Sequence, residues 1–242
     1  MTVGDTFRID LHVHSRHSTR PSQWMLQKIG APECFTEPAK LYRIARARGM
    51  SMVTITDHNT IGGALEIAHL PGAFVSEEIT TYFPEDRCKL HVLAYAITEA
   101  QHEDIQHLRE NVFDLVGYLR EAGIRHVLAH PLFAVNDRLT VEHFEQCLLL
   151  FDTFEINGTR DNMQNRVLTT IINNLCEADI ERLAERHAVA PHGDEPWAKG
   201  LTGGSDDHSS LNIARMHTEM DGPPTLDNLL LRLGNGDVIP FW

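Results

Sequence analysis

The chain has 242 residues and a mass of 27.3 kDa, which is enough for one large domain or two small ones. It carries 34 acidic and 21 basic residues, and the resulting net charge of −13 argues against general binding to nucleic-acid phosphates. No apolar run approaches the roughly 18–20 residues that a membrane helix needs. Asp5, Arg8 and Asp10 interrupt the N-terminus, which therefore does not resemble a signal peptide.

Cysteine and histidine usage indicates the compartment and the kind of site. The cysteines at positions 34, 88, 147 and 176 form no CxxC pair. We therefore expect reduced thiols in a cytoplasmic protein, with no zinc–thiolate site. The chain also holds 15 histidines. Abundant histidine and acid without paired cysteine points to metal held by nitrogen and oxygen.

The apolar pattern predicts strands that alternate with helices. Phe7, Ile9, Leu11 and Val13 alternate with polar residues and predict a first strand, and a loop over residues 15–38 follows. Helices are then expected over residues 38–49, 63–69, 99–121, 141–149, 162–187 (as one helix or two) and 225–233. Strands are expected over residues 50–56, 73–79, 90–96, 124–129, 151–156 and 201–205. This alternation favours a single α/β domain with parallel strands, as a barrel or a doubly wound sheet.

Polar side chains cluster where the predicted strands end, which is where parallel α/β folds carry their active sites. His12 and His14 leave the same face of the first strand, and Asp10 shares that face and is placed to orient a histidine. The other clusters are Asp57-His58, Glu77-Glu78, His91, His130 and Asp206-Asp207-His208. Burying so many ionisable groups together is costly unless metal or protons satisfy them, so we predict a metal site.

Several short segments, taken in order, resemble the successive motifs of the polymerase and histidinol phosphatase (PHP) family. They are Asp10–Ser15, Thr56–Asn59, Glu78–Ile79, Leu90–Val92, Ala129–Pro131 and Gly204–His208. The resemblance implies that residues 1–242 form one PHP-type domain, a distorted, TIM-like (β/α)7 barrel. It also implies two or three divalent metal ions at the carboxyl ends of the strands, and hydrolysis of phosphate esters.

The resemblance further implies ligands for each ion. The first would be held by His12, His14, Glu78 and Asp206, with Glu78 bridging to a second ion completed by His91 and His130. The third would be held by His58 and His208. Where the family usually adds an aspartate or histidine to the third ion, this chain has Thr19. Glu33 is the preferred substitute and His17 the second choice.

The donor types and the resemblance together suggest a mechanism. Histidine and carboxylate ligands suit Zn, Mn or Fe. A metal-activated water would attack phosphorus, and a water on the third ion, His208 or Asp57 would protonate the leaving oxygen. Arg160, Arg215 and Arg20 are candidate phosphate clamps, because guanidinium groups bind phosphate through a planar fork.

The leading hypothesis is a metal-dependent phosphoesterase acting on a small phosphorylated metabolite or nucleotide. One alternative is an exonuclease-type phosphodiesterase acting on oligonucleotides, which the acidic charge disfavours. Another is a non-catalytic, metal-stabilised module of a larger protein. A related amidohydrolase fits the motif order less well. The sequence indicates neither the identity of the substrate nor the oligomeric state.

Overall fold

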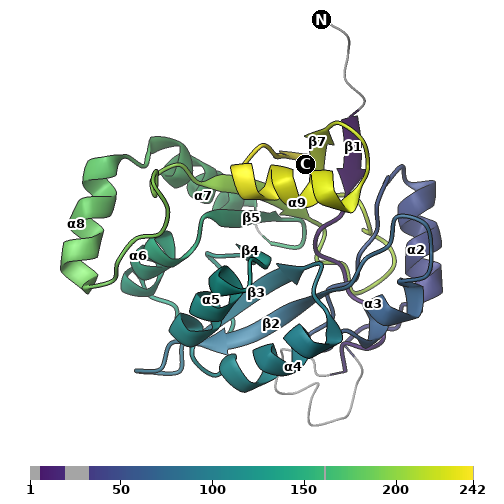
Figure 1. Ribbon diagram of the computed structural model, residues 1–242, viewed down its shortest axis with the longest axis horizontal. Coiled ribbons are helices and arrows are strands. Elements are labelled where there is room, and N and C mark those ends of the chain that lie inside the picture. The colour runs from purple at the N-terminus through teal and green to yellow at the C-terminus, as the bar shows by residue number, and fades with distance from the viewer. Residues whose placement is uncertain (1–5, 20–32, 161, 242) are drawn as a thin grey trace, which may run out of the picture.

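The computed structural model describes residues 6–19, 33–160 and 162–241, and within them the strands form two sheets (Figure 1). The smaller sheet has the order β1-β7-β8, from β1 (Thr6–Ile9), β7 (His217–Asp221) and β8 (Ile239–Phe241). The larger has the order β2-β3-β4-β5-β6. Its strands are β2 (Ser76–Tyr82), β3 (Lys89–Tyr95), β4 (Arg125–Leu128), β5 (Thr153–Asn157) and β6 (Gly200–Gly204).

The helices follow the expected order with one clear correction. They are α2 (Pro38–Ala47), α3 (Gly62–Ile67), α4 (Glu99–Leu108), α5 (Val112–Glu121), α6 (Val141–Leu150), α7 (Asn162–Asn174), α8 (Glu177–His187) and α9 (Leu226–Asn235). The single helix expected over residues 99–121 is wrong, because Asn111 caps a new helix by accepting a hydrogen bond from the Phe113 backbone amide. The segment 162–187 is two helices, one of the two forms that the sequence left open.

The strand directions differ from the parallel arrangement predicted. The pairs β4–β5 and β5–β6 are parallel, whereas β2–β3 and β3–β4 are antiparallel. The connection from β2 to β3 spans only residues 83–88, which is too short for the crossover that parallel strands need. β1 also pairs antiparallel with β7, a strand that the sequence did not predict because His217-Thr218-Glu219 masks its apolar pattern.

The strand expected over residues 50–56 is not a regular element. Its segment makes an isolated parallel bridge from Val53 to Ala73, and another bridge joins His58 to Glu78. On the other side, Val13 bridges to Asp207, and the Thr56 amide donates to the Val13 carbonyl at 2.9 Å. The segments around Val13 and Thr56 thus lie between the end of β6 and β2 and link them through single bridges and hydrogen bonds, without forming regular strands. A closed seven-stranded barrel stays a prediction.

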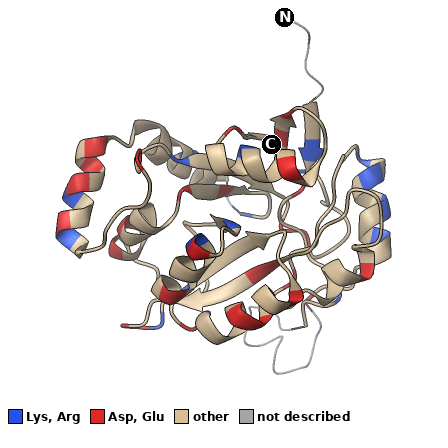
Figure 2. Ribbon diagram, in the orientation of Figure 1, with Lys and Arg blue, Asp and Glu red and all other residues tan. Residues whose placement is uncertain are grey.

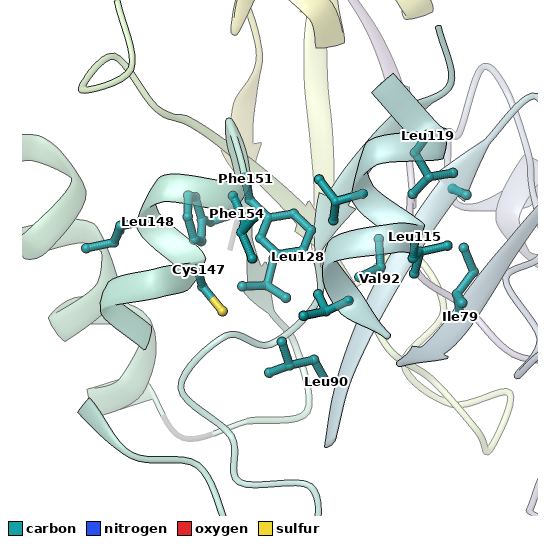
Figure 3. Close-up of a cluster of buried hydrophobic side chains, with 14 of the residues drawn as sticks. Ile79, Leu90, Val92, Leu115, Leu119, Leu128, Cys147, Leu148, Phe151 and Phe154 are labelled. Carbon is teal, nitrogen blue, oxygen red and sulfur yellow. The ribbon is translucent and has the colours of Figure 1, made fainter. Parts of the chain in front are cut away.

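The larger sheet is buried on both faces. Val92 and Leu128 face the apolar cluster in Figure 3, which Leu115 of α5 also joins. The alternate residues Leu93 and Val127 belong to a second cluster with β1 and α9. Because successive strand residues point to opposite faces, both sets must be apolar, and the strands appear in the sequence as continuous apolar runs. Burial on both faces fixes the strands, and with them the polar residues at their ends.

The charged side chains are unevenly distributed (Figure 2). α2 carries lysine and arginine but no acid, whereas α4 carries acids but no lysine or arginine. None of the helices in the described ranges is both long and apolar enough to cross a membrane. All four cysteines are free thiols.

Candidate metal centre

The segment that follows β1 carries two histidines into the middle of a buried polar cluster. His12 and His14 are fully buried, and their Nε2 atoms lie 3.0 Å apart. The residues after β6 run alongside them, since the Asp206 amide donates to the His12 carbonyl at 2.7 Å and the His14 amide donates to the Asp207 carbonyl at 3.1 Å. The ends of two strands thus bring His12, His14 and Asp206 together.

The hydrogen bond made by Nδ1 of each histidine ring determines whether the other ring nitrogen, Nε2, has a free lone pair. His12 Nδ1 lies 2.8 Å from Glu155 Oε1, and a carboxylate only accepts, so His12 Nδ1 carries the proton. His14 Nδ1 lies 2.9 Å from Ser18 Oγ, whose hydroxyl donates to Asp57 Oδ1 at 3.0 Å. His14 Nδ1 is therefore also the protonated nitrogen. Both Nε2 lone pairs then face each other, an arrangement that a cation between them stabilises.

Glu78 lies in the middle of the cluster, and each of its two carboxylate oxygens faces a different set of histidines. Its Oε1 is 2.8 Å from His91 Nδ1 and 3.2 Å from His130 Nε2. Its Oε2 is 2.8 Å from His58 Nδ1 and 3.2–3.3 Å from the Nε2 atoms of His14 and His12. One carboxylate therefore contacts histidines on both sides, which is the position of a bridging ligand.

Three overlapping groups bring their donor atoms within 4.8 Å of one another: His12–His14–Asp206, His58–Glu78–His91 and His14–His58–His208. The first contains three of the four residues expected at one ion and lacks Glu78. In the second, His58 stands where His130 was expected. Glu33 lies beside the third group, with Oε2 3.5 Å from His58 Nε2 and Oε1 3.8 Å from His208 Nε2.

Divalent metal ions fit this set of donors. Glu78 Oε2, His58 Nδ1, His91 Nδ1 and His208 Nε2 are buried and have no hydrogen-bond partner in the part of the chain that the structure describes, although charged groups approach them. Unsatisfied buried polar atoms are costly, and metal ligation removes that cost. Imidazole nitrogen and carboxylate oxygen are the donors of Zn, Mn and Fe sites.

Burial and mutual attraction shift the pKa values of these groups strongly. Burial lowers the pKa of His12, but the carboxylates of Glu155, Glu78 and Asp206 outweigh it and hold that pKa well above its usual value. Burial likewise raises the pKa of Glu78, but the surrounding histidines hold it well below the usual range. Glu78 is therefore ionised and binds positive charge tightly, which a metal ion supplies as well as protons do.

Two residues of the cluster adopt left-handed backbone conformations, Asp206 with φ 49° and His130 with φ 29°. Non-glycine residues rarely adopt positive φ, and such strain concentrates at functional sites. The His130 amide donates to Glu155 Oε2 at 2.9 Å, which holds this turn in place beside the cluster.

Sequence reasoning missed Glu155 and Asn157 of β5. Glu155 binds His12, and Asn157 Nδ2 donates to Glu155 Oε2 at 2.9 Å and to Asp206 Oδ2 at 3.2 Å. The available signal was a single charge within the otherwise apolar run Phe154-Glu155-Ile156.

Several expected roles need correction. Asp10 accepts from backbone amides, those of His12 at 3.3 Å, Ser205 at 2.9 Å and Ala214 at 2.7 Å, and within the described residues it has no hydrogen bond to a histidine ring. Glu77 points away from the cluster, because alternate residues of β2 face opposite sides. His17 lies outside the cluster, where its Nε2 pairs with Glu66 at 2.7 Å.

The arginine candidates separate clearly. Arg160 Nη2 donates to Asp206 Oδ2 at 3.0 Å, and its guanidinium lies 3.8 Å over the Phe133 ring. Arg215 is exposed and donates to Asn212 Oδ1 at 3.4 Å, away from the cluster. Arg20 lies outside the described residues.

The comparisons with known proteins bear on the fold. No protein-family model matches the chain. A 72-residue stretch is 35% identical to an uncharacterised protein of Methanocaldococcus jannaschii, and it covers 30% of this chain and 40% of that protein. A two-domain protein from Bacteroides vulgatus, which contains a predicted PHP-like metal-dependent phosphoesterase, superposes with a TM-score of 0.63 and 13% identity. The chain has the PHP-like fold. The match covers 99% of this chain and 65% of the Bacteroides chain.

Two further solved structures match this chain in fold. The lesion-specific endonuclease PfuEndoQ from Pyrococcus furiosus matches with a TM-score of 0.56 and 14% identity, over 98% of this chain and 58% of that chain. An amidohydrolase from Chromobacterium violaceum matches with a TM-score of 0.56 and 16% identity, over 96% and 97% of the two chains. The chain thus spans less than two thirds of the Bacteroides and Pyrococcus proteins. The resemblance that the motifs indicate is confirmed at the level of the fold.

Proposed function

We propose that the protein is a metal-dependent phosphoesterase that hydrolyses an ester of a small phosphorylated molecule. One observation carries the proposal: the Nε2 atoms of His12 and His14 face each other at 3.0 Å between the carboxylates of Glu78 and Asp206. The PHP-like fold and the neighbouring Arg160 support it.

The three overlapping groups, with His130 and Glu33 beside them, would hold two or three ions, with Zn, Mn or Fe preferred. Such ions supply an activated water and neutralise charge on the phosphoryl group. The protein's own contribution is to keep the donor atoms fixed, through Glu155 behind His12 and the Ser18–Asp57 pair behind His14.

Arg160 is the candidate clamp for the substrate phosphate. Its side chain is 26% exposed, and its Nε has no hydrogen-bond partner within the described ranges. Asp206 and the ring of Phe133 hold its guanidinium in one plane. A guanidinium fixed in this way with a free N–H can donate to a phosphoryl oxygen next to the metal ligands.

The two residues expected to protonate the leaving oxygen are better suited to other roles. Asp57 is fully buried and accepts from Ser15 N at 2.7 Å, Ser15 Oγ at 2.6 Å and Ser18 Oγ at 3.0 Å, so it positions the loop behind His14. Burial lowers the pKa of His208 to about 4, so its imidazole is neutral, the form that binds metal. We therefore propose His208 as a ligand and Asp57 as a positioning residue.

The test compares three substrates with metal-loaded protein: a generic phosphomonoester, a phosphodiester and a short oligonucleotide. We expect phosphate release from the monoester, lost in His12→Ala and kept in His69→Ala, a matched control at an exposed histidine. Activity confined to the oligonucleotide would favour the nuclease alternative. Inactivity on all three, with a large fall in Tm on chelation, would overturn the proposal in favour of a metal-stabilised module.

A further inference from the structure

A second polar cavity lies at the end of the larger sheet opposite the metal centre. Its volume is about 110 Å³, and residues lining it include Arg120 of α5, Arg125 and His126 of β4, and Asp152 before β5. Arg125 is the first residue of β4, whereas His130 of the metal centre follows the last. The cavity is therefore separated from the metal centre by the length of this strand.

Two guanidinium groups give this cavity an excess of positive charge. Arg120 and Arg125 line it together with His126 and His192, and Asp152 is the one carboxylate among the described residues that do so. Burial lowers the pKa of His126, so its imidazole is neutral and adds no charge. Asp152 is shared, since its oxygens lie 3.8 Å from His192 Nε2 and 3.7 Å from Lys199 Nζ. This excess of positive charge occurs in a chain whose net charge is −13.

Arg120 of the cavity lining, and Lys199, which does not line the cavity but lies beside Asp152, each carry a buried nitrogen that lacks a hydrogen-bond acceptor within the described residues. The side chain of Lys199 is fully buried, and its Nζ has no hydrogen-bond partner in the described part of the chain. Arg120 Nε is in the same state, although Arg120 Nη2 donates to the Leu150 carbonyl. Burial lowers the pKa of Lys199 to about 8, Asp152 opposes this shift, and Arg120 adds to it. Lys199 and Arg120 thus repel each other and lack hydrogen-bond acceptors at these atoms, and a bound anion would relieve both unfavourable effects.

We propose that this cavity binds a small phosphate-type dianion. Such an ion supplies several acceptor oxygens to the guanidinium donors of Arg120 and Arg125, and charge-assisted hydrogen bonds of this kind are the strong ones. The buried ammonium of Lys199, beside Asp152, adds electrostatic attraction. The volume is several times the roughly 10–15 Å³ that one water needs, so the cavity accommodates a small oxyanion with water. The proposal does not rest on the proposed phosphoesterase function, because it involves none of the same residues.

The test titrates metal-loaded protein with inorganic phosphate, by calorimetry and by Tm, against chloride at matched ionic strength. Asp206→Asn serves as the background in which phosphate binding at the metal centre is weakened. In that background we expect saturable phosphate binding that becomes at least about tenfold weaker in Arg125→Gln and in Lys199→Met. The control Arg182→Gln, at an exposed ion pair of α8, should bind phosphate as the background does.

The same variants also test whether the substitutions disturb folding and whether the cavity binds free phosphate or a phosphomonoester. Lys199→Met removes a buried cation that lacks a hydrogen-bond partner, so it should keep its Tm, and both cavity variants alone should keep any phosphomonoesterase activity. A phosphomonoester is titrated in parallel, and its binding relative to inorganic phosphate identifies which source the cavity accepts. Phosphate binding that disappears with Asp206→Asn, or that neither cavity variant weakens, would overturn the proposal.

Discussion

Nδ1 of His12 lies 2.8 Å from Oε1 of Glu155, and both side chains are buried. The other oxygen of Glu155 accepts from the His130 amide and from Asn157 Nδ2, each at 2.9 Å. Three donors therefore converge on one carboxylate, which fixes the orientation of the His12 ring and raises its basicity as a ligand.

Replacing Glu155 with glutamine should weaken metal binding about ten- to a hundredfold, because its amide group must face at least one of these donors. Competition with a chelator measures the affinity. Glu145→Gln is the matched control, since Glu145 pairs with His187 Nε2 at 2.7 Å far from the centre. Equal metal affinity in the two variants would show that Glu155 does not support the ligands.

Gly204→Ala should destabilise the protein by about 1–3 kcal/mol and reduce its metal content. An added Cβ would lie 2.4 Å from His12 Cβ and 2.6 Å from Glu155 Oε1, so both side chains would have to move. Thermal unfolding and metal analysis check this outcome. Gly117→Ala in α5 meets nothing within 4 Å and should stabilise by up to about 1 kcal/mol. A Gly204→Ala protein as stable as wild type would contradict the close packing described.

Arg160→Gln should raise KM for a phosphomonoester about tenfold or more, because a charge-assisted contact with phosphate is lost. Metal content must be measured alongside, since Arg160 also contacts Asp206. Arg182→Gln should leave KM unchanged. If Arg160→Gln keeps both kcat and KM, Arg160 has no part in substrate binding.

The pair Glu77–His102 should make stability depend on pH. The hydrogen bond to Glu77, 3.0 Å away, raises the pKa of His102 above 6.5. A raised histidine pKa contributes stability that is full below the unfolded value and is lost as pH rises through the folded one. His102→Gln should therefore cost about 1 kcal/mol near pH 6 and less near pH 9, as measured by urea unfolding. A difference that grows with pH would contradict this assignment.

Most residues that the structure brings together in the candidate metal centre are ones that the sequence singled out, because their signal is local. The pair His12-x-His14 alternates on one face of an extended segment, and Asp206 follows a glycine-rich strand end. Glu155 and Ser18 were missed because the periodic pattern of apolar residues does not reveal hydrogen bonds between side chains. Glu155 binds His12, which is distant in sequence, and Ser18 binds His14 from within a loop.

The sequence was less informative about strand direction and element boundaries. The apolar run 50–56 is compatible with a strand, yet only Val53 makes a bridge there, because pairing depends on partners from elsewhere in the chain. The break between α4 and α5 depends on Asn111, whose capping role competes with its weak preference for helix interiors.

Glu77 and Glu78 are neighbours in β2, yet one contacts α4 and the other lies between the histidines. A slip of β2 by one residue against β3 would exchange the two carboxylates and withdraw the bridging one from the histidines. Only the correctly registered hairpin can then capture the ions. Metal binding would therefore stabilise the native β2–β3 register relative to shifted registers. The ions would then contribute to correct folding as well as to the reaction.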